Sequence, residues 1–248
     1  MHQARVSVVL PAYNAAAYVA TAIDSVLRQT FPDFELIVLD NASVDATADI
    51  VARFDDPRLR FVRNDANVGM VGNINKGLEL ATGQLGVVLC ADDHWHPEFL
   101  QRSIARQREE PGLTFTNSRV LSQGRETVFA NVHAGRAEVA PWRLVRHLHG
   151  IPLSSLVFPL AQSGVRFDAR LPFNCDLEFV LRTLLRDARR LTYIDWPGVY
   201  VNLHDANETL RYDIRRENAK LLDIVSGYAR NPLLRVLIAF QKARLHRG

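Results

Sequence analysis

The chain has 248 residues, of which 48% are hydrophobic and 23% are charged, a composition typical of a globular protein with one large core or two fused lobes. Its formal net charge of +3 is too small to indicate a nucleic-acid partner, and we expect none. The two cysteines, Cys90 and Cys175, are isolated and show no Cys-x-x-Cys spacing, which suits a reducing cytoplasm better than a disulfide framework.

No segment of the sequence predicts a signal peptide or a membrane span. The first apolar run, Val6–Leu10, is too short for the hydrophobic part of a signal peptide. No stretch approaches the ~20 apolar residues that cross a bilayer. We therefore expect a cytoplasmic protein, and a peripheral position at the inner face of a membrane stays open.

The first hundred residues alternate short β-rich runs with segments of helical periodicity. Strands are expected at Val6–Leu10, Phe34–Leu39, Leu59–Val62 and Leu85–Leu89, and helices at Tyr18–Arg28, about Asp45–Phe54 and Val71–Leu80. This alternation predicts an α/β fold with a Rossmann-like, doubly wound, mostly parallel sheet. Ligands of such sheets bind beyond the carboxyl ends of the strands. The loops after the first, second and fourth strands are therefore the candidate site.

The second half is less regular but shows no linker, repeat or low-complexity segment, so we expect one continuous body with two lobes. Apolar residues run through Leu153–Pro159. A helix is expected at Asp176–Arg186, and strands at Gly112–Leu121, Arg125–Ala130 (after a Ser-Gln-Gly turn), Leu191–Ile194 and Val199–Leu203.

The loop after the first strand, Pro11-Ala-Tyr-Asn14, contains no glycine. A dinucleotide fingerprint would require glycines there, and the chain also lacks a GxxxxGK[ST] phosphate loop. Both observations disfavour a nicotinamide dehydrogenase and a P-loop kinase.

The second strand ends in an acid, Asp40, which is followed three residues later by the sequence Ser43-Val-Asp45. An acid at this place can accept a hydrogen bond from a base N–H or a ribose hydroxyl. Alternatively, Asp40 and Ser43 cap the following helix. The residues alone favour neither interpretation.

The fourth strand runs into the adjacent acids Asp92 and Asp93. Adjacent carboxylates repel each other unless they are exposed or bound to a cation, and a hard divalent ion can bridge them to a diphosphate. The alternative is a solvated turn. His94 and His96 could suggest zinc, but the residues around them do not complete a zinc set.

Taken together, these segments resemble the opening of the family-2 inverting glycosyltransferases of GT-A fold. The resemblance covers roughly the first hundred residues, and its motifs fall in order at the spacing of a βα alternation. It rests on Val6–Asn14, Ser25–Thr47, Asn67-Val-Gly69, Asn73–Gly77, Ala81-Thr-Gly83 and the pair Asp92-Asp93. The resemblance implies a bacterial-type, UDP-sugar-dependent enzyme with a GT-A-like fold, an acceptor-side lobe and C-terminal helices.

The resemblance also implies roles for residues of the first half. The donor nucleotide would be held by Pro11, Ala12, Tyr13, Asp40, Asn67, Lys76 and Asp92. Asp40 would accept from the uracil ring N–H, Lys76 would reach the base or the diphosphate, and Asp92 would lie near the ribose and the metal. Asp93 would bind Mn²⁺ or Mg²⁺. Many relatives carry a further acid at the position of Cys90.

Beyond residue 110 the resemblance is limited to two segments. In Asn174-Cys-Asp-Leu-Glu178, Asp176 falls on the family's catalytic base and Cys175 replaces a glutamate. In the segment Tyr200–Asn207, His204 falls on a histidine that can complete the metal shell, although Asn202 stands where an arginine is usual. A purely structural role for His204 stays open.

The sequence therefore predicts transfer of a sugar from a nucleotide diphosphate donor to a saccharide or lipid-linked saccharide, by a single metal-assisted displacement with inversion. Residues 1–110 would bind the donor, residues 111–212 would form the acceptor and catalytic half of the same domain, and residues 213–248 a helical segment. A nucleotidyltransferase would need a glycine-rich first loop. An inactive homologue that senses sugar nucleotides or assists assembly stays open, because acids are missing at Cys90 and Cys175.

The C-terminal segment from Arg230 onward carries five Lys or Arg and no acid, interspersed with apolar residues. One interpretation is a basic amphipathic helix that contacts a membrane surface. The other is a helix that packs on the body and exposes a solvated basic face.

Overall fold

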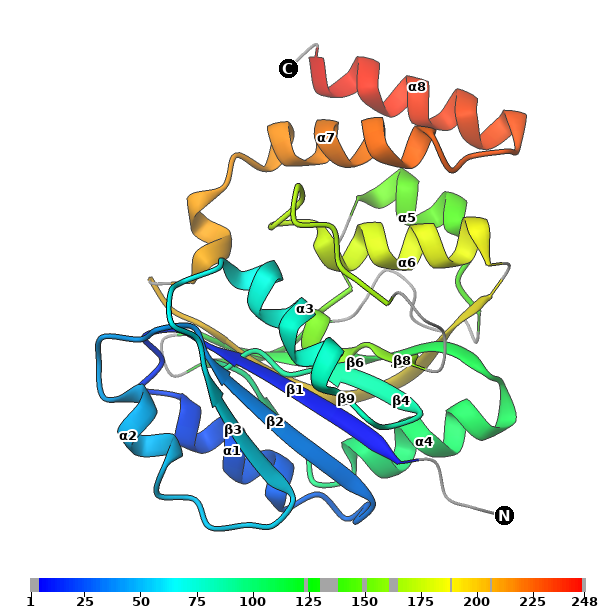
Figure 1. Ribbon diagram of the computed structural model, residues 1–248. Helices are drawn as coiled ribbons and strands as arrows, with labels where there is room; N and C mark the ends of the chain where they lie inside the picture. Colours follow the sequence, from blue (N-terminus) through cyan, green and yellow to red (C-terminus); the bar gives the residue numbers. More distant parts are fainter. Residues whose placement is uncertain are drawn as a thin grey trace.

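A computed structural model describes residues 5–122, 125–129, 138–148, 151–160, 165–187, 189–205 and 207–246. The expected turn at 123–124, Ala130 at the end of an expected strand and Arg247 in the C-terminal segment lie outside the described residues. The chain forms a nine-stranded sheet of order β3-β2-β1-β4-β8-β6-β9-β5, in which β7 pairs with β6 (Figure 1).

The four strands of the first half are parallel to one another, as the alternating pattern predicts. Each is followed by a helix or by a loop at the same edge of the sheet. The elements in chain order are β1 Val6–Ala12, α1 Val19–Leu27, β2 Phe34–Asp40, α2 Thr47–Val51, β3 Leu59–Arg63, α3 Met70–Leu80 and β4 Leu85–Val88.

The second half extends the same sheet with strands of mixed direction: β8 is antiparallel to β4 and β6, and β9 is parallel to β6. Its strands are β5 His94–Trp95, β6 Gly112–Ser122, β7 Arg125–Phe129, β8 Val157–Pro159 and β9 Arg190–Leu203. Its helices are α4 Phe99–Glu109, α5 Pro141–His147, η1 Leu153–Ser155, α6 Cys175–Arg186, η2 Glu208–Arg211, α7 Ile214–Ser226 and α8 Pro232–His246.

Helices cover both faces of the sheet, and the alternation of side chains along each strand divides the core into two clusters. Val9 and Ile37 face the cluster that includes α3 and α6, whereas Val8 and Leu36 face the cluster that includes α1 and α4. In Figure 1, α1, α2 and α4 lie below the sheet, and α3 and α5 to α8 lie above it. Burial on both faces explains why the central strands read as continuous apolar runs.

Two element predictions differ from the structure. Helix α2 spans only Thr47–Val51, because the residues before it form a tied loop. The two strands expected at 191–194 and 199–203 are one strand, β9, whose register with β6 shifts between Thr116 and Ser118. The Pro197-Gly198 pair, which suggests the end of a strand in the sequence, lies at this irregularity within β9.

Gly77 lets α3 lie close to the sheet. A Cβ atom at this position would stand 2.4 Å from Val9 Cγ1 and 2.7 Å from Leu39 Cδ1. We expect Gly77→Ala to lower the free energy of unfolding by about 1–3 kcal/mol, because the neighbouring side chains are fully buried and must shift. Urea denaturation measures this change. Gly72→Ala is the matched control, since its Cβ meets only the exposed Val68 side chain at 3.3 Å and should leave stability unchanged or raised.

Candidate functional site

The site lies where the strand order reverses. From β1 the chain continues to β2 and β3 on one side, and β4 returns to the other side of β1. In parallel sheets the loops at the carboxyl ends diverge at such a point and leave a crevice for a ligand. The ends of β1, β2 and β4 meet at this edge, and together with the loops that follow them they carry six of the ten candidate residues.

The loops after β1 and β2 are tied together by hydrogen bonds in both directions. The Asn14 N–H donates to Ser43 Oγ at 2.9 Å, and the Val44 N–H donates to Asn14 Oδ1 at 3.0 Å. Asn14 and Ala42 have positive φ values of 48° and 59°, an uncommon backbone conformation that the surrounding bonds must hold. Tyr13 lies in the loop after β1, and half of its surface is exposed.

Asp40 is buried at the end of β2, and within the described part of the chain only one of its two carboxylate oxygens accepts a hydrogen bond. Oδ1 accepts from the Ser43 N–H at 3.0 Å. Oδ2 lies 3.2 Å from Arg63 Nε, but the geometry makes no hydrogen bond. Neither Asp40 nor Ser43 caps α2, whose first residue is preceded by Ala46 without a side-chain cap. Oδ2 is thus a buried acceptor that retains hydrogen-bonding capacity.

A network of side-chain amides supports the loop between β3 and α3. Asn67 Oδ1 accepts from Asn41 Nδ2 at 2.8 Å and from the Gly69 N–H at 2.8 Å. Lys76 Nζ donates to Asn64 Oδ1 at 2.6 Å. The structure therefore places Asn67 and Lys76 in one polar network beside the end of β2, where their contacts fix the loop.

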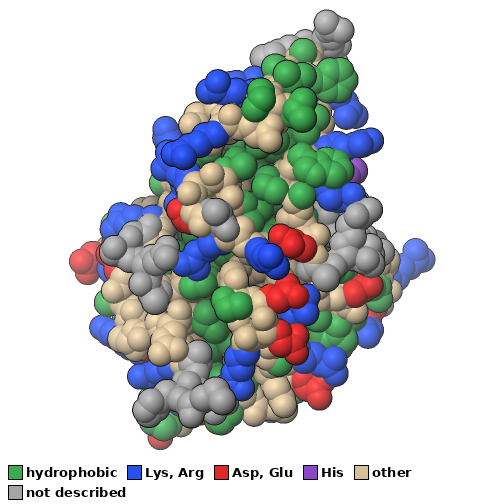
Figure 2. Space-filling model, turned by 90° about the vertical axis from the view of Figure 1, so that its right-hand side faces the viewer, with side chains coloured by type: hydrophobic (Ala, Val, Ile, Leu, Met, Phe, Trp, Pro, Cys, Tyr) green, Lys and Arg blue, Asp and Glu red, His purple; other side chains and the backbone are tan. Residues whose placement is uncertain are grey.

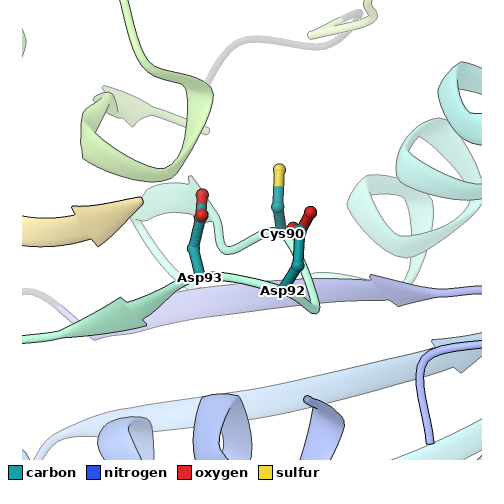
Figure 3. A group of neighbouring side chains, drawn as sticks. All are labelled: Cys90, Asp92 and Asp93. Carbon is teal, nitrogen blue, oxygen red and sulfur yellow. The ribbon is translucent and has the colours of Figure 1, made fainter. Parts of the chain in front are cut away.

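The loop after β4 presents Cys90, Asp92 and Asp93, whose potential ligand atoms all lie within 4.8 Å of one another. Figure 3 shows the three side chains on the same side of the loop, with Cys90 beside Asp92 and Asp93 set apart from them. Within the described residues, this is the only group of at least three Cys, His, Asp or Glu that could hold a metal ion.

The two acids have different surroundings. Asp93 is buried, and both of its oxygens accept: Oδ2 from the Ser154 hydroxyl at 2.6 Å and Oδ1 from the Asn202 N–H at 3.2 Å. Burial, and secondarily the charge of Asp92, raises the pKa of Asp93. The Asp92 side chain is 28% exposed, and its Oδ2 accepts from Asn207 Nδ2 at 2.9 Å. Asp92 is therefore the more accessible carboxylate.

His204 converges on Asp92 from the end of β9. Its Nε2 lies 3.3 Å from Asp92 Oδ2 without making a hydrogen bond, and its ring stacks on Tyr18 with centroids 4.6 Å apart. Both ring nitrogens are buried without a hydrogen-bond partner in the described part of the chain. A carboxylate oxygen and an imidazole nitrogen that approach in this way fit two ligands of one divalent ion.

Cys90 and the two other histidines fit a metal less well. Burial raises the pKa of the Cys90 thiol well above its usual value, so it stays protonated and is a poor ligand. His94 stacks on Tyr200, and His96 packs against Trp196 while its Nδ1 accepts from the Glu98 N–H. These ring contacts account for the His-x-His pair structurally.

The beginning of α6 carries two acids with distinct environments. Glu178 is fully buried and pairs with Arg182 at 2.9 Å, and it accepts from the Tyr228 hydroxyl at 2.8 Å. Asp176 is partly exposed, and its Oδ1 accepts a hydrogen bond from the Leu177 N–H at 2.7 Å. Burial raises the pKa of Asp176 to about 7. Asp176 can therefore exchange a proton near neutral pH, whereas Glu178 ties α6 to the segment that follows α7.

Four residues of the site were not singled out by the sequence: Tyr18, Arg63, Ser154 and Asn207. Asn207 ends the segment around His204, and its position three residues after that histidine is the only local signal. Asn174 occupies the N-cap position of α6, but its side chain makes no capping bond and donates through Nδ2 to Asn218 Oδ1 at 3.1 Å.

Comparison with known proteins gives matches to one family. Residues 7–151 match the sequence profile of Glycosyl transferase family 2. The chain is 35% identical over 103 residues to the amylovoran biosynthesis glycosyltransferase AmsB of Erwinia amylovora, covering 40% of this chain and 34% of that protein. It is 36% identical over 100 residues to the UDP-Glc:alpha-D-GlcNAc-diphosphoundecaprenol beta-1,3-glucosyltransferase WfgD of Escherichia coli, covering 40% of each.

Solved structures with the same architecture cover nearly the whole chain. The S. aureus TarS fragment 1-349 in complex with UDP-GlcNAc has a TM-score of 0.78 at 20% identity, covering 98% of this chain and 71% of that chain. The mannosyltransferase PcManGT of Pyrobaculum calidifontis, in complex with GDP-Man and Mn²⁺, has a TM-score of 0.70 at 19% identity, covering 99% of this chain and 71% of that chain. The GT-A-like α/β fold expected from the sequence is thus confirmed.

The matches to curated relatives are partial. The chain covers between 29% and 52% of the length of the first curated relatives that it matches. Among the described residues, no helix combines the length and the apolar character that crossing a membrane requires.

Proposed function

Because this chain belongs to glycosyl transferase family 2, we propose that it transfers a sugar from a nucleotide diphosphate donor to an acceptor hydroxyl with inversion at the anomeric carbon. The observation that carries this proposal is the convergence of Asp92 and His204, 3.3 Å apart, at the strand-order reversal, on the same edge of the sheet as the buried acceptor Asp40. This arrangement offers a nucleotide site and a divalent-ion site at one edge of the sheet.

The donor nucleotide, which we propose to be UDP, lies against the tied loops after β1 and β2. Asp40 Oδ2 accepts from the base N–H, since it is buried and makes no hydrogen bond of its own. Tyr13 covers the base from its exposed position, and Pro11 and Ala12 form the floor beneath it. Asn67 and Lys76 support this pocket through the amide network. A rigid pocket loses little entropy when the donor binds.

We propose that Asp92 and His204 bind Mn²⁺ or Mg²⁺ directly. Asp93 lies next to these ligands and does not contact the ion. Asp93 was expected as a direct ligand, but both of its oxygens already accept protein hydrogen bonds. Its negative charge still favours a cation at the neighbouring Asp92. When bound, the ion neutralises charge on the leaving diphosphate.

Asp176 is the proposed general base. A base that takes a proton from the acceptor hydroxyl works best with a pKa near the operating pH, and burial raises the pKa of Asp176 to about 7. Cys175, at the beginning of α6, is among the groups that raise the pKa of Cys90, which supports a position of the helix beginning near the acidic loop. For the acceptor we propose a saccharide or lipid-linked saccharide, because the relative WfgD is named for a diphosphoundecaprenol-linked sugar.

A thermal-shift panel of UDP, GDP and dTDP sugars, with and without Mn²⁺, tests the proposal. A ligand that binds only the folded state adds about 2.7 kcal/mol of stability at a hundredfold excess over Kd. We expect the largest shift with a UDP-sugar plus Mn²⁺, and its loss in EDTA. Donor hydrolysis then separates an enzyme from an inactive sugar-nucleotide binder, for which Cys90 and Cys175 in place of acids are the argument. Binding without any turnover would favour the binder.

We expect Asp40→Ala to weaken UDP binding by roughly tenfold to a hundredfold, because a charge-assisted hydrogen bond contributes about 1.5–3 kcal/mol. The loss should be the same with Mn²⁺ and with EDTA, since Asp40 contacts the base. Isothermal titration with UDP measures it. Asp49→Ala, an exposed acid on α2, is the control and should bind normally. Equal affinity of Asp40→Ala and wild type would remove Asp40 from the donor site.

A further inference from the structure

Helix α8 is apolar on two sides. Leu234 and Ile238 are buried against the body, as expected for a packed helix. Leu233, Val236 and Phe240 are 78%, 67% and 65% exposed, respectively. Their spacing of three and four residues places them on one face of the helix. An exposed apolar stripe beside a packed face is unusual for a helix that only covers a core.

A basic groove between α5 and α8 adjoins this stripe at Phe240. Its lining includes Arg146 and His147 of α5, and Leu237, Phe240 and Arg244 of α8. An adjoining hollow is lined by Arg146 and Arg244 together with Arg215 of α7. Gln241 Nε2 donates to the Arg146 carbonyl at 2.7 Å, so the two helices hold the groove in a fixed shape.

The charged residues that line the groove and the adjoining hollow are all basic. Neither α5 nor α8 contains an Asp or a Glu. Arg146 and Arg244 are exposed. Figure 2 shows the upper part of the molecule, over these helices, with hydrophobic and basic side chains and with acidic side chains only lower down on that face. A cationic surface of this kind complements an anionic partner.

Trp142 adds an aromatic side chain to the same surface. It is 46% exposed on α5, and it lies four residues before Arg146 on one face of that helix. Tryptophan is enriched at the headgroup level of membranes because its ring is apolar and its N–H is polar. We call these exposed residues the docking face: Trp142, Arg146, Leu233, Phe240 and Arg244.

We propose that the docking face binds the surface of an anionic lipid bilayer. Leu233 and Phe240 enter the boundary of headgroups and acyl chains, Arg146 and Arg244 bind lipid phosphates, and Trp142 lies at headgroup depth. A second copy of the chain is a poorer occupant, because a two-fold contact would place the same arginines against each other. This proposal is independent of the sugar-transfer chemistry and would hold for an inactive homologue.

Co-sedimentation with vesicles tests the docking face. We expect the protein to bind vesicles that contain phosphatidylglycerol at low salt, to bind pure phosphatidylcholine far less, and to be released by 0.5 M salt. The emission of Trp142 should shift to shorter wavelength on binding. Trp142→Phe should lose that shift, because Trp95 is buried in the core and Trp196, which is partly buried, lies on β9 outside the docking face. Free phosphate should not compete, since a bilayer and not a single anion is the ligand.

Matched variants locate the contact. Arg146→Glu with Arg244→Glu should weaken the partition coefficient by on the order of a hundredfold, and Leu233→Ser with Phe240→Ser by at least about tenfold. Arg60→Glu with Arg108→Glu, two exposed arginines on β3 and α4, makes the same charge change elsewhere and tests net charge alone. These side chains are exposed, so unchanged melting temperatures should accompany every variant.

Three outcomes would overturn the proposal. The first is no binding to anionic vesicles at low salt. The second is equal weakening by the Arg60→Glu, Arg108→Glu control, which would mean that net charge alone directs the protein. The third is a dimer in sedimentation velocity that the Leu233→Ser, Phe240→Ser variant disrupts, with vesicle binding unaffected. Donor binding in free solution should be unchanged by all docking-face variants, so failure here is distinct from failure of the proposed reaction.

Discussion

Asp176→Asn should lower kcat with the true acceptor by about 10²–10⁴-fold, which corresponds to about 3–5 kcal/mol of transition-state stabilisation. The amide that replaces the carboxylate cannot take a proton from the acceptor hydroxyl, but it keeps the size and the helix position of Asp176. UDP and Mn²⁺ should bind to the variant as to wild type, because Asp176 lies outside the proposed donor and ion sites. Steady-state kinetics and titration calorimetry separate the two effects.

Glu178→Gln is the control for this assignment, since it changes a carboxylate two residues away on the same helix. Glu178 is fully buried with Arg182 and Tyr228 as partners, and loss of its charge leaves the Arg182 guanidinium unpaired. We expect a lower melting temperature, and a kcat close to wild type at temperatures where the variant is folded. If turnover persisted in Asp176→Asn and collapsed in folded Glu178→Gln, the base would be Glu178.

The pH profile gives an independent test of Asp176. The pKa of its carboxyl is raised by burial to about 7, and only the ionised form is a base. Activity should therefore rise as the pH increases through about 7 and level off above it. In Asp176→Asn the residual activity should lose this acidic limb. A wild-type profile that is flat between pH 5 and 8 would contradict the role.

The first half of the fold could be predicted because its signals are local. Each strand there is a short apolar run, and α1 and α3 have helical periodicity, so bounds differ from the structure by only one or two residues. The position of Asp40 at a strand end follows from the same pattern. These features depend on neighbours in sequence, which is the information that periodicity contains.

The partners of the acidic loop could not be predicted, because they come from distant segments. Ser154 contacts Asp93 across 61 residues, and Asn207 contacts Asp92 across 115 residues. Nothing local marks Ser154 in its apolar stretch as the partner of an acid. The sequence therefore favoured Asp93 as the direct ligand, whereas the contacts of the folded chain leave Asp92 the more accessible carboxylate.

For the C-terminal segment, the sequence could not predict which side of the helix faces the protein. Packing on the body and a basic amphipathic surface were alternatives in the sequence, yet α8 combines a packed face with an exposed apolar stripe. Apolar residues on most sides of a helix do not reveal which side faces the protein. The choice is made by α5 and α7, whose residues Arg146 and Asp223 bond to Gln241 and Lys242 of α8.

Asp92→Ala and His204→Ala should each lower Mn²⁺ affinity by about a hundredfold or more in the presence of UDP. Each change removes one of the two side chains that converge on a single point, and an ion that loses a protein ligand must take water instead. The affinity is measured by the paramagnetic resonance signal of free Mn²⁺, which does not depend on turnover. UDP affinity in EDTA should stay near wild type for both variants, because the base contacts are made by Asp40 and Tyr13.

The variants Asp93→Asn and Ser154→Ala test whether Asp92 or Asp93 is the direct ligand of the ion. If Asp93 does not contact the ion, these changes alter the second layer around the ion and should cost only about 10–100-fold in Mn²⁺ affinity, less than Asp92→Ala. Cys90→Ser should be nearly neutral, because the thiol is protonated and buried. An Asp93→Asn protein that loses Mn²⁺ completely while Asp92→Ala retains it would make Asp93 the direct ligand. A carboxylate oxygen can accept a hydrogen bond and bind an ion at the same time, so in that case the bond from Ser154 to Asp93 Oδ2, at 2.6 Å, would orient Asp93 as a ligand.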